Sequence, residues 1–136
     1  MQHRVPIPHE PPMHWLDSAS LSDDGLAATA SATITPEHPF LRDGQLLRSA
    51  LIELMAQGAA AGSALKAARQ NKKVRTGMLV ALSDCRITAG APVGATVHLT
   101  AVHERSFGPL SMARLEARIN NQLIASARMT FHLHFE

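Results

Sequence analysis

The strongest hydrophobic pattern in the sequence is helical and runs from about Gln45 to Arg69. Apolar or small residues recur there at intervals of three and four, at Leu47, Leu51, Leu54, Met55, Gly58, Ala59, Gly62 and Leu65. The other side is apolar as well, with Ala50, Ile52, Ala56 and Ala60. A helix that is apolar nearly all round is buried on most sides, so other elements must cover it.

Strand patterns flank this helix. Before it, an extended stretch at 13–17 and an alternating stretch at 26–34 surround a turn at 22–25, which predicts an antiparallel hairpin. After it, strands are predicted from Gly77 toward Ile87, from Thr96 to Arg105, from Met112 to Ile119 and from Leu123 to Phe135, the last two joined by a tight turn at Asn120-Asn121. A curved antiparallel sheet around one helix follows, which is an α+β fold in a single domain over residues 1–136.

Composition narrows the choice of partners. The apolar fraction is 46% but aromatic residues make up only 4%, so small side chains fill much of the core and backbones are expected to pack closely. The net charge is +2, basic residues are scattered, and no aromatic platform lies between them, which argues against nucleic acid. Cys85 is the only cysteine, so no internal disulfide forms, as suits a reducing compartment.

The start of the chain also bears on its location. The stretch from Met1 to Pro6 is polar and proline-containing, without the apolar run of a signal peptide. No segment of the sequence approaches the length of a membrane span. We therefore expect a soluble, cytoplasmic protein without a membrane partner.

Glu53 is the first candidate for chemistry, because it lies inside the most apolar part of the predicted helix. A carboxylate is rarely buried unless it is paired or functional, and burial would prepare it as a general acid or base. The alternative is an exposed glutamate that bonds Arg48. Gln57 follows one helical turn later, where it could orient Glu53 and bind substrate, or simply bond to backbone.

Two further candidates precede the helix. His38 lies between Pro36 and Pro39, which would hold it stiffly, and histidine is a natural proton shuttle. With eight histidines in the chain, a surface loop histidine is the competing interpretation. Gly44 would let a ligand approach the helix N-terminus, whose N–H groups polarise a carbonyl, although a plain helix-entry turn explains it equally.

Other residues are given simpler roles. His9 is expected to be structural and Cys85 to lie in the core. His132 and His134 share one face of the last strand without a third ligand of suitable spacing, so an exposed face is expected rather than a metal site. The sequence contains no phosphate loop, dinucleotide fingerprint or zinc motif, so no cofactor is predicted.

Three stretches, in order, resemble the 3-hydroxyacyl-carrier-protein dehydratase family. The segment Ile7–Asp17 is similar to the family's opening Leu-Pro-His-Arg-x-Pro-x-Leu-Leu-x-Asp, and Ile52–Gln57 to its helical Glu-Ala-Met-Ala-Gln. Pro92-Val93-Gly94 resembles its Val-Pro-Gly-Asp turn, and the end of the chain, with Ala125-Ser126-Ala127, fits as well. The resemblance covers nearly the whole chain from Ile7 onward.

The resemblance implies a hot-dog dimer with its active site at the interface, where one subunit gives a histidine and the other an acid. Histidine removes the α-proton of a 3-hydroxyacyl thioester and the acid protonates the departing hydroxyl. Glu53 matches the acidic position, and His38 is the residue to which the histidine role is carried. The family's Gly-His-Phe-Pro-Gly region is replaced by the shorter 42–47, as in a divergent branch associated with aryl-polyene gene sets.

Several alternatives stay open at this point. The thioester is carried by acyl carrier protein or coenzyme A, and the chain forms a homodimer, a higher oligomer of dimers, or a heterodimer with a related hot-dog subunit. A hot-dog thioesterase could use an acid on the same helix to activate water, and a non-catalytic partner subunit would complete another chain's site. A basic rim at Arg69, Lys72, Lys73 and Arg75 could meet an acidic carrier or be merely solvated.

Overall fold

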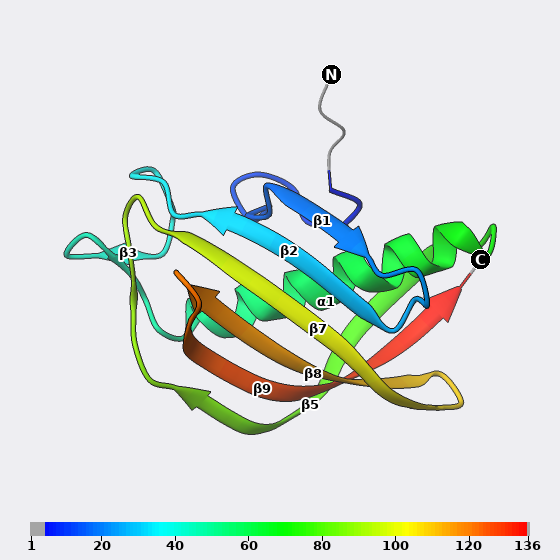
Figure 1. Cartoon of the computed structure of the whole chain (residues 1–136). Helices are drawn as coiled ribbons and strands as arrows, with labels where there is room; N and C mark the ends of the chain where they lie inside the picture. Colours follow the sequence, from blue (N-terminus) through cyan, green and yellow to red (C-terminus); the bar gives the residue numbers. More distant parts are fainter. Residues whose placement is uncertain (1–4, 136) are drawn as a thin grey trace.

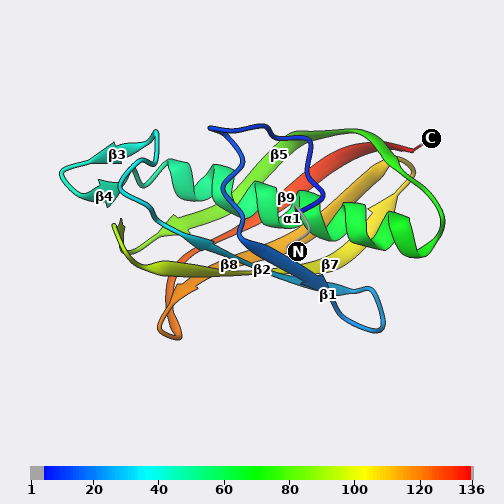
Figure 2. The ribbon, with the colours of Figure 1, turned by 90° about the horizontal axis from the view of Figure 1, so that it is seen from above.

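The computed structural model describes residues 5–135. Residues 1–4, which belong to the stretch where no signal peptide is expected, lie outside the described residues. The helix α1 (Ala50–Arg69) lies against one face of a large curved sheet (Figures 1 and 2). The predicted α+β fold, with a sheet wrapped around one long helix, is confirmed.

Six strands form the large sheet: β1 (Ser18–Leu21), β2 (Ala27–Thr33), β5 (Val74–Ile87), β7 (Thr96–Phe107), β8 (Leu110–Ile119) and β9 (Gln122–Phe135). Their order is β1-β2-β7-β8-β9-β5, and neighbours pair antiparallel. The β8–β9 turn at Asn120 and Asn121 has φ of 49° and 65°, as a two-residue hairpin turn requires. The predicted strands after the helix are therefore confirmed.

The helix begins five residues later than its pattern predicts. Gln45 and Leu46 instead form β4 (Gln45–Leu46), which pairs with β3 (Leu41–Arg42) and β6 (Ala91–Pro92) in a second, small sheet. Leu46 is buried although it is not helical. Leu47, the first residue of the helical pattern, lies outside the helix too, because its backbone N–H bonds to the carbonyl of Phe40 at 2.8 Å.

The first strand was also misplaced. Residues 13–17 were predicted to be extended and paired, but pairing starts only at Ser18, opposite Ser31. The backbone N–H of Trp15 is bonded instead to the side chain of Gln57 on the helix. The segment before β1 is thus attached to α1, while β2 stands where the pattern at 26–34 predicts it.

Close packing between helix and sheet depends on glycine in α1. A Cβ atom placed on Gly62 would lie 2.7 Å from the Cβ of Ala28 in β2, a separation that side chains do not tolerate. A Cβ on Gly58 would meet Leu99 at 3.4 Å, which is tight but adjustable. The small residues predicted to allow close backbone packing therefore do so at the α1–β2 contact.

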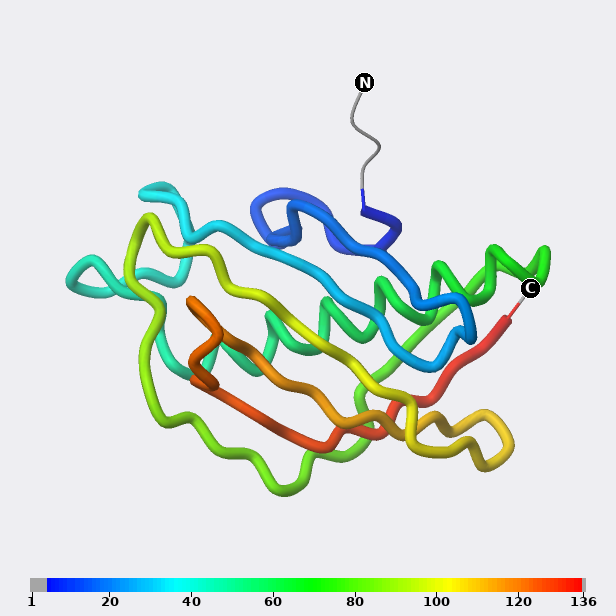
Figure 3. The backbone as a smooth tube through the Cα atoms, viewed as in Figure 1, coloured from blue at the N-terminus to red at the C-terminus, as the bar shows by residue number. Residues whose placement is uncertain are grey.

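The two edges of the large sheet differ strongly. The edge strand β1 has four residues, and its serines bond across to β2. The other edge, β5, has 14 residues, and Figure 3 shows the chain running along it after leaving the end of α1. Every residue from Arg75 to Arg86 is exposed, including Met78, Val80 and Leu82. Cys85, expected in the core, is exposed on this edge as well.

Candidate active site

Glu53 lies in the first turn of α1 and is held by two side chains. Its Oε1 atom is 2.9 Å from Nε2 of His9 and accepts a hydrogen bond of 3.1 Å from Nε2 of Gln57. The Glu53 side chain is 36% exposed. It is therefore neither the fully buried carboxylate nor the solvated one that bonds Arg48, but a half-open group in a fixed position.

Gln57 connects this carboxylate to the segment before β1. It is completely buried, and its amide nitrogen donates to Met13 O at 2.6 Å as well as to Glu53. Its Oε1 accepts from the backbone N–H of Trp15 at 3.0 Å. The predicted contact between Gln57 and Glu53 exists, and the buried amide is bonded to protein groups. Binding of substrate by Gln57 stays a prediction.

The two oxygens of Glu53 differ in their surroundings. Both donors engage Oε1, while Oε2 has no hydrogen-bond partner among residues 5–135. The carboxylate is thus fixed through one oxygen and presents the other. Such a group can exchange a proton with a bound substrate without first having to be oriented.

His9 was expected to be structural, and the contact with Glu53 was missed. The residue lies in the N-terminal segment, which is anchored by the buried side chains of Ile7, Trp15 and Leu16. These anchors bring His9 over the first turn of the helix. The proline-rich sequence around it shows no periodicity, so the one signal in the sequence was the Ile7-Pro8-His9 motif of the family resemblance.

His38 occupies a different environment. Its ring lies on Trp15, with centroids 4.4 Å apart, and its Nδ1 accepts the backbone N–H of Phe40 at 3.1 Å. Burial lowers the pKa of His38 below the ordinary value of 6.5, which favours the neutral ring. Its Nε2 is buried and lacks a hydrogen-bond partner among the described residues.

This geometry bears on the role of His38, whose part in catalysis stays a prediction. An Nδ1 atom that accepts a hydrogen bond is unprotonated, so the neutral ring carries its proton on Nε2. That atom can donate a hydrogen bond to a substrate oxygen but has no lone pair with which to take an α-proton. No hydrogen bond or ion pair joins His38 to Glu53, and the two are linked through Trp15 and Gln57.

Gly44 does not lie at the helix N-terminus. It occupies the turn between β3 and β4 with φ of 75°, and its carbonyl accepts the N–H of Val93 at 2.9 Å. The helix starts only at Ala50, because the residues between are paired in the small sheet. The predicted interaction of a ligand with helix N–H groups at Gly44 therefore loses its structural basis, and substrate binding there stays a prediction.

The basic rim, metal binding and membrane spans were also considered in the sequence, and the structure bears on each of them. Arg69, part of the predicted basic rim, donates to the carbonyls of Leu21 and Ser22. No group of three or more His, Cys, Asp or Glu within residues 5–135 could hold a metal ion. In the same part of the chain, no helix combines the length and apolar character needed to cross a membrane.

Comparison with known proteins decides the family. Residues 2–133 match the model of the ApeP-like family, described as ApeP dehydratase. The chain belongs to the ApeP-like family. An ApeP-like chain is a dehydratase-like protein of the hydro-lyase type, which agrees with the resemblance in the sequence. No curated protein sequence matches it.

Solved structures similar to this ApeP-like chain share its hot-dog fold. The dehydratase heterocomplex ApeI:P from Xenorhabdus doucetiae is 21% identical with a TM-score of 0.86, covering 96% of this chain and 89% of that one. The E. coli PaaI protein from the phenylacetic acid degradation operon is 16% identical with a TM-score of 0.65, covering 85% and 79%. A homologue of HP0420 from Helicobacter felis is 11% identical with a TM-score of 0.70, covering 96% and 85%.

Proposed function

We propose that this chain is the acid-bearing subunit of a hot-dog dehydratase dimer that removes water from 3-hydroxyacyl thioesters. The observation that carries the proposal is the Glu53 carboxyl group, fixed through Oε1 by His9 and Gln57 and open at Oε2. Membership in the ApeP-like dehydratase family supports the same reaction type.

The reaction breaks a C–H bond at the α-carbon and the C–O bond at the β-carbon, and forms a C=C bond and water. Protonated Glu53 gives its proton from Oε2 to the departing hydroxyl. The carboxylate that remains is stabilised by the donors on Oε1, which are already in position. The base takes up the α-proton and releases it to solvent. Glu53 then takes a proton back from solvent, which completes the cycle.

In this proposal the base comes from elsewhere than His38. In this chain the His38 ring is suited to donate from Nε2, for example to the thioester carbonyl, because Phe40 occupies its Nδ1. A second hot-dog subunit can supply the base from its own loop. That arrangement agrees with a heterodimer, and the similar protein from Xenorhabdus doucetiae is named as part of a dehydratase heterocomplex.

The edge strand β5 is the surface we propose for the second subunit. Met78 is 66% exposed, and Val80 and Leu82 next to it are also open to solvent. A long apolar edge with unpaired backbone groups favours pairing with another strand. A second hot-dog chain adding its own edge would continue the sheet and cover these side chains, whether as a homodimer, a heterodimer or an oligomer of dimers.

This interface has a direct test. Replacing both Met78 and Val80 by lysine should give a folded chain that no longer associates, because two charges would be buried in the new contact. Light scattering after size exclusion measures the mass, alone and with a hot-dog dehydratase subunit. Val102→Lys, on an exposed apolar residue of β7, is the matched control. An unchanged complex with the double variant would remove β5 from the interface.

The acyl carrier and the compartment belong to the same proposal. Lys72, Lys73 and Arg75 are exposed just after α1, where they could meet an acidic acyl carrier protein, and a coenzyme A thioester is the simpler alternative. A single exposed cysteine suits the reducing cytoplasm. Biosynthesis of fatty acids or polyenes is the setting in which a 3-hydroxyacyl thioester is dehydrated.

The activity assay separates the alternatives. The chain is incubated with a 3-hydroxyacyl thioester, alone and with a hot-dog dehydratase subunit, while enoyl absorbance and free thiol are followed together. Enoyl product that is lost with Glu53→Gln but kept with Glu37→Gln, an exposed glutamate, supports the proposal. Free thiol would instead indicate a thioesterase. If the complex with Glu53→Gln is as active as the complex with the wild-type chain, this chain is a non-catalytic partner.

A further inference from the structure

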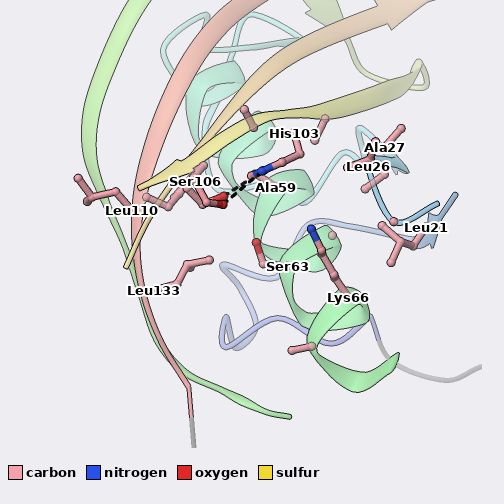
Figure 4. Close-up of a pocket in the computed structure, with 18 of the residues that line it drawn as sticks. Leu21, Leu26, Ala27, Ala59, Ser63, Lys66, His103, Ser106, Leu110 and Leu133 are labelled. Atoms are coloured by element: carbon pink, nitrogen blue, oxygen red, sulfur yellow. Dashed lines mark hydrogen bonds between the residues drawn. The ribbon is translucent and has the colours of Figure 1, made fainter. Parts of the chain in front are cut away.

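A cavity of about 310 Å³ lies between the C-terminal half of α1 and the concave face of the sheet, away from Glu53. It is lined by α1 together with β1, β2, β7, β8, β9 and the turns beside them, and Figure 4 shows its labelled side chains. A volume of this size suits a small organic molecule. None of the residues assigned to the dehydratase site lines it.

The helix itself separates the cavity from the proposed active site. Ser63 lies ten residues after Glu53, or about 15 Å along the helix axis at about 1.5 Å per residue. With 3.6 residues per turn, Ser63 lies about 80° and Lys66 about 140° away from Glu53 around the axis, and both lie about 120° or more away from Gln57. An acyl chain bound at Glu53 therefore does not continue directly into this cavity.

Lys66 is the charged residue of this lining, which contains no Asp or Glu among the described residues. Figure 4 shows its amine turned toward Ser63 and His103. No ion pair of Lys66 exists within residues 5–135. A lysine without an acidic partner, at the wall of a cavity, is a ready partner for an anion.

The polar groups beside Lys66 do not compensate its charge. The His103 ring forms hydrogen bonds with two serine hydroxyls there. Its Nε2 atom lies 3.2 Å from the hydroxyl of Ser106, and its Nδ1 atom lies 3.4 Å from the hydroxyl of Ser111. Burial, and then the charge of Lys66, lowers the pKa of His103, so the ring is neutral near pH 7. The polar side of the cavity thus carries one positive charge and several hydrogen-bonding groups.

The rest of the wall is apolar, with large side chains such as Leu21, Leu110, Phe131 and Leu133 beside small alanines. A ligand that matches both parts needs an anionic head and an apolar body. We propose that this cavity binds a medium-chain carboxylate, with its head at Lys66 and its chain along these residues. The site is independent of the proposed dehydration.

A lysine in the last turn of a helix also stabilises the helix dipole. That effect acts whether the cavity is empty or filled, so it cannot make binding depend on the charge of a ligand. Discrimination between ligands of equal length and different charge is therefore the decisive property.

The experiment uses the full chain and three probes that share an eight-carbon tail: octanoate, octan-1-ol and octylamine. Isothermal titration calorimetry near pH 7 should show saturable binding of octanoate, binding of octanol weaker by about tenfold, and none of octylamine, since a hydrogen bond to a charged group contributes about that factor. Equal binding of octanol and octanoate would overturn the proposal, as would no binding of octanoate.

Variants locate the site. Lys66→Met keeps the aliphatic part of the side chain and should weaken octanoate binding about tenfold. Lys73→Met, at an exposed lysine, should leave octanoate binding unchanged. Ser63→Met should reduce binding by filling the cavity. Glu53→Gln should leave octanoate binding intact even though it should slow dehydration. Loss of binding in Glu53→Gln, or full binding in Lys66→Met, would place the ligand elsewhere and overturn the assignment.

Discussion

Glu53 near the start of α1 and Lys66 near its end are both charged residues, but they differ in their partners. Near the start, Glu53 is bound by His9 and Gln57, which are themselves fixed by the segment before β1. Near the end, Lys66 faces a cavity and has no acidic partner among the described residues. The first arrangement pre-orients a group for chemistry, whereas the second leaves a charge whose partner must come from outside.

The largest effect is expected at the first end. Glu53→Gln should lower the rate of dehydration by about a hundredfold or more, because a general acid contributes about 10² to 10⁴ to the rate. Steady-state assays of the assembled dimer measure it. His9→Asn keeps the acid but loosens its position, so its rate of dehydration should lie between those of the wild type and of Glu53→Gln. If His9→Asn equals wild type, the contact with Oε1 does not serve catalysis.

Gln57 distinguishes positioning from stability at the same end. Gln57→Leu leaves the N–H of Trp15 and the carbonyl of Met13 without their buried partner and should destabilise the fold by about 2 kcal/mol. Urea unfolding measures this, with the exposed Gln122→Leu as control. A neutral result would mean that the segment before β1 is held by its apolar anchors alone.

The second end depends on a close approach to the sheet. Gly62→Ala gains helix propensity but pushes a methyl group against Ala28, so a net loss of about 1 kcal/mol is expected. Gly58→Ala meets only the flexible Leu99 and should be neutral or stabilising. Thermal unfolding of the two variants makes the comparison. Equal stabilisation of both would show that α1 can shift away from β2.

The smallest effect is in the pH dependence. Burial lowers the pKa of both His38 and His103 from 6.5, so below pH 6.5 the unfolded chain takes up protons that the folded chain refuses. The free energy of unfolding should therefore fall as the pH drops from 7 through 6.5. His38→Gln and His103→Gln should each flatten this slope, and the exposed His98→Gln should not. An unchanged slope in both variants would contradict their burial.

Periodicity predicts the long elements well, because each buries a continuous face. The strands from Thr96 onward and the body of α1 follow their patterns, and Glu53 stands out as a carboxylate within an apolar helix. The start of α1 and the first strand were misplaced, because pairing of Leu46 and attachment of Trp15 to Gln57 are long-range contacts. Such contacts override local spacing.

The same contrast between local and long-range contacts explains why only part of the site could be predicted from the sequence. The contact between Gln57 and Glu53 is local, one helical turn apart, and could be expected from spacing. His9 lies 44 positions before Glu53, and only the folded N-terminal segment brings the two together. The protonation of the His38 ring depends on a hydrogen bond from Phe40 that no sequence pattern shows.

Arg69 has a consequence for anyone who redesigns this surface. In the sequence it is one of a cluster of basic residues that look interchangeable, but its guanidinium closes the carbonyls of the β1–β2 turn onto the end of α1. A lysine there would keep the charge and lose the several parallel donors. Charge-reducing variants intended to map a carrier-binding surface should therefore alter Lys72, Lys73 and Arg75 and leave Arg69 in place, so that weaker binding is not confused with a loosened hairpin.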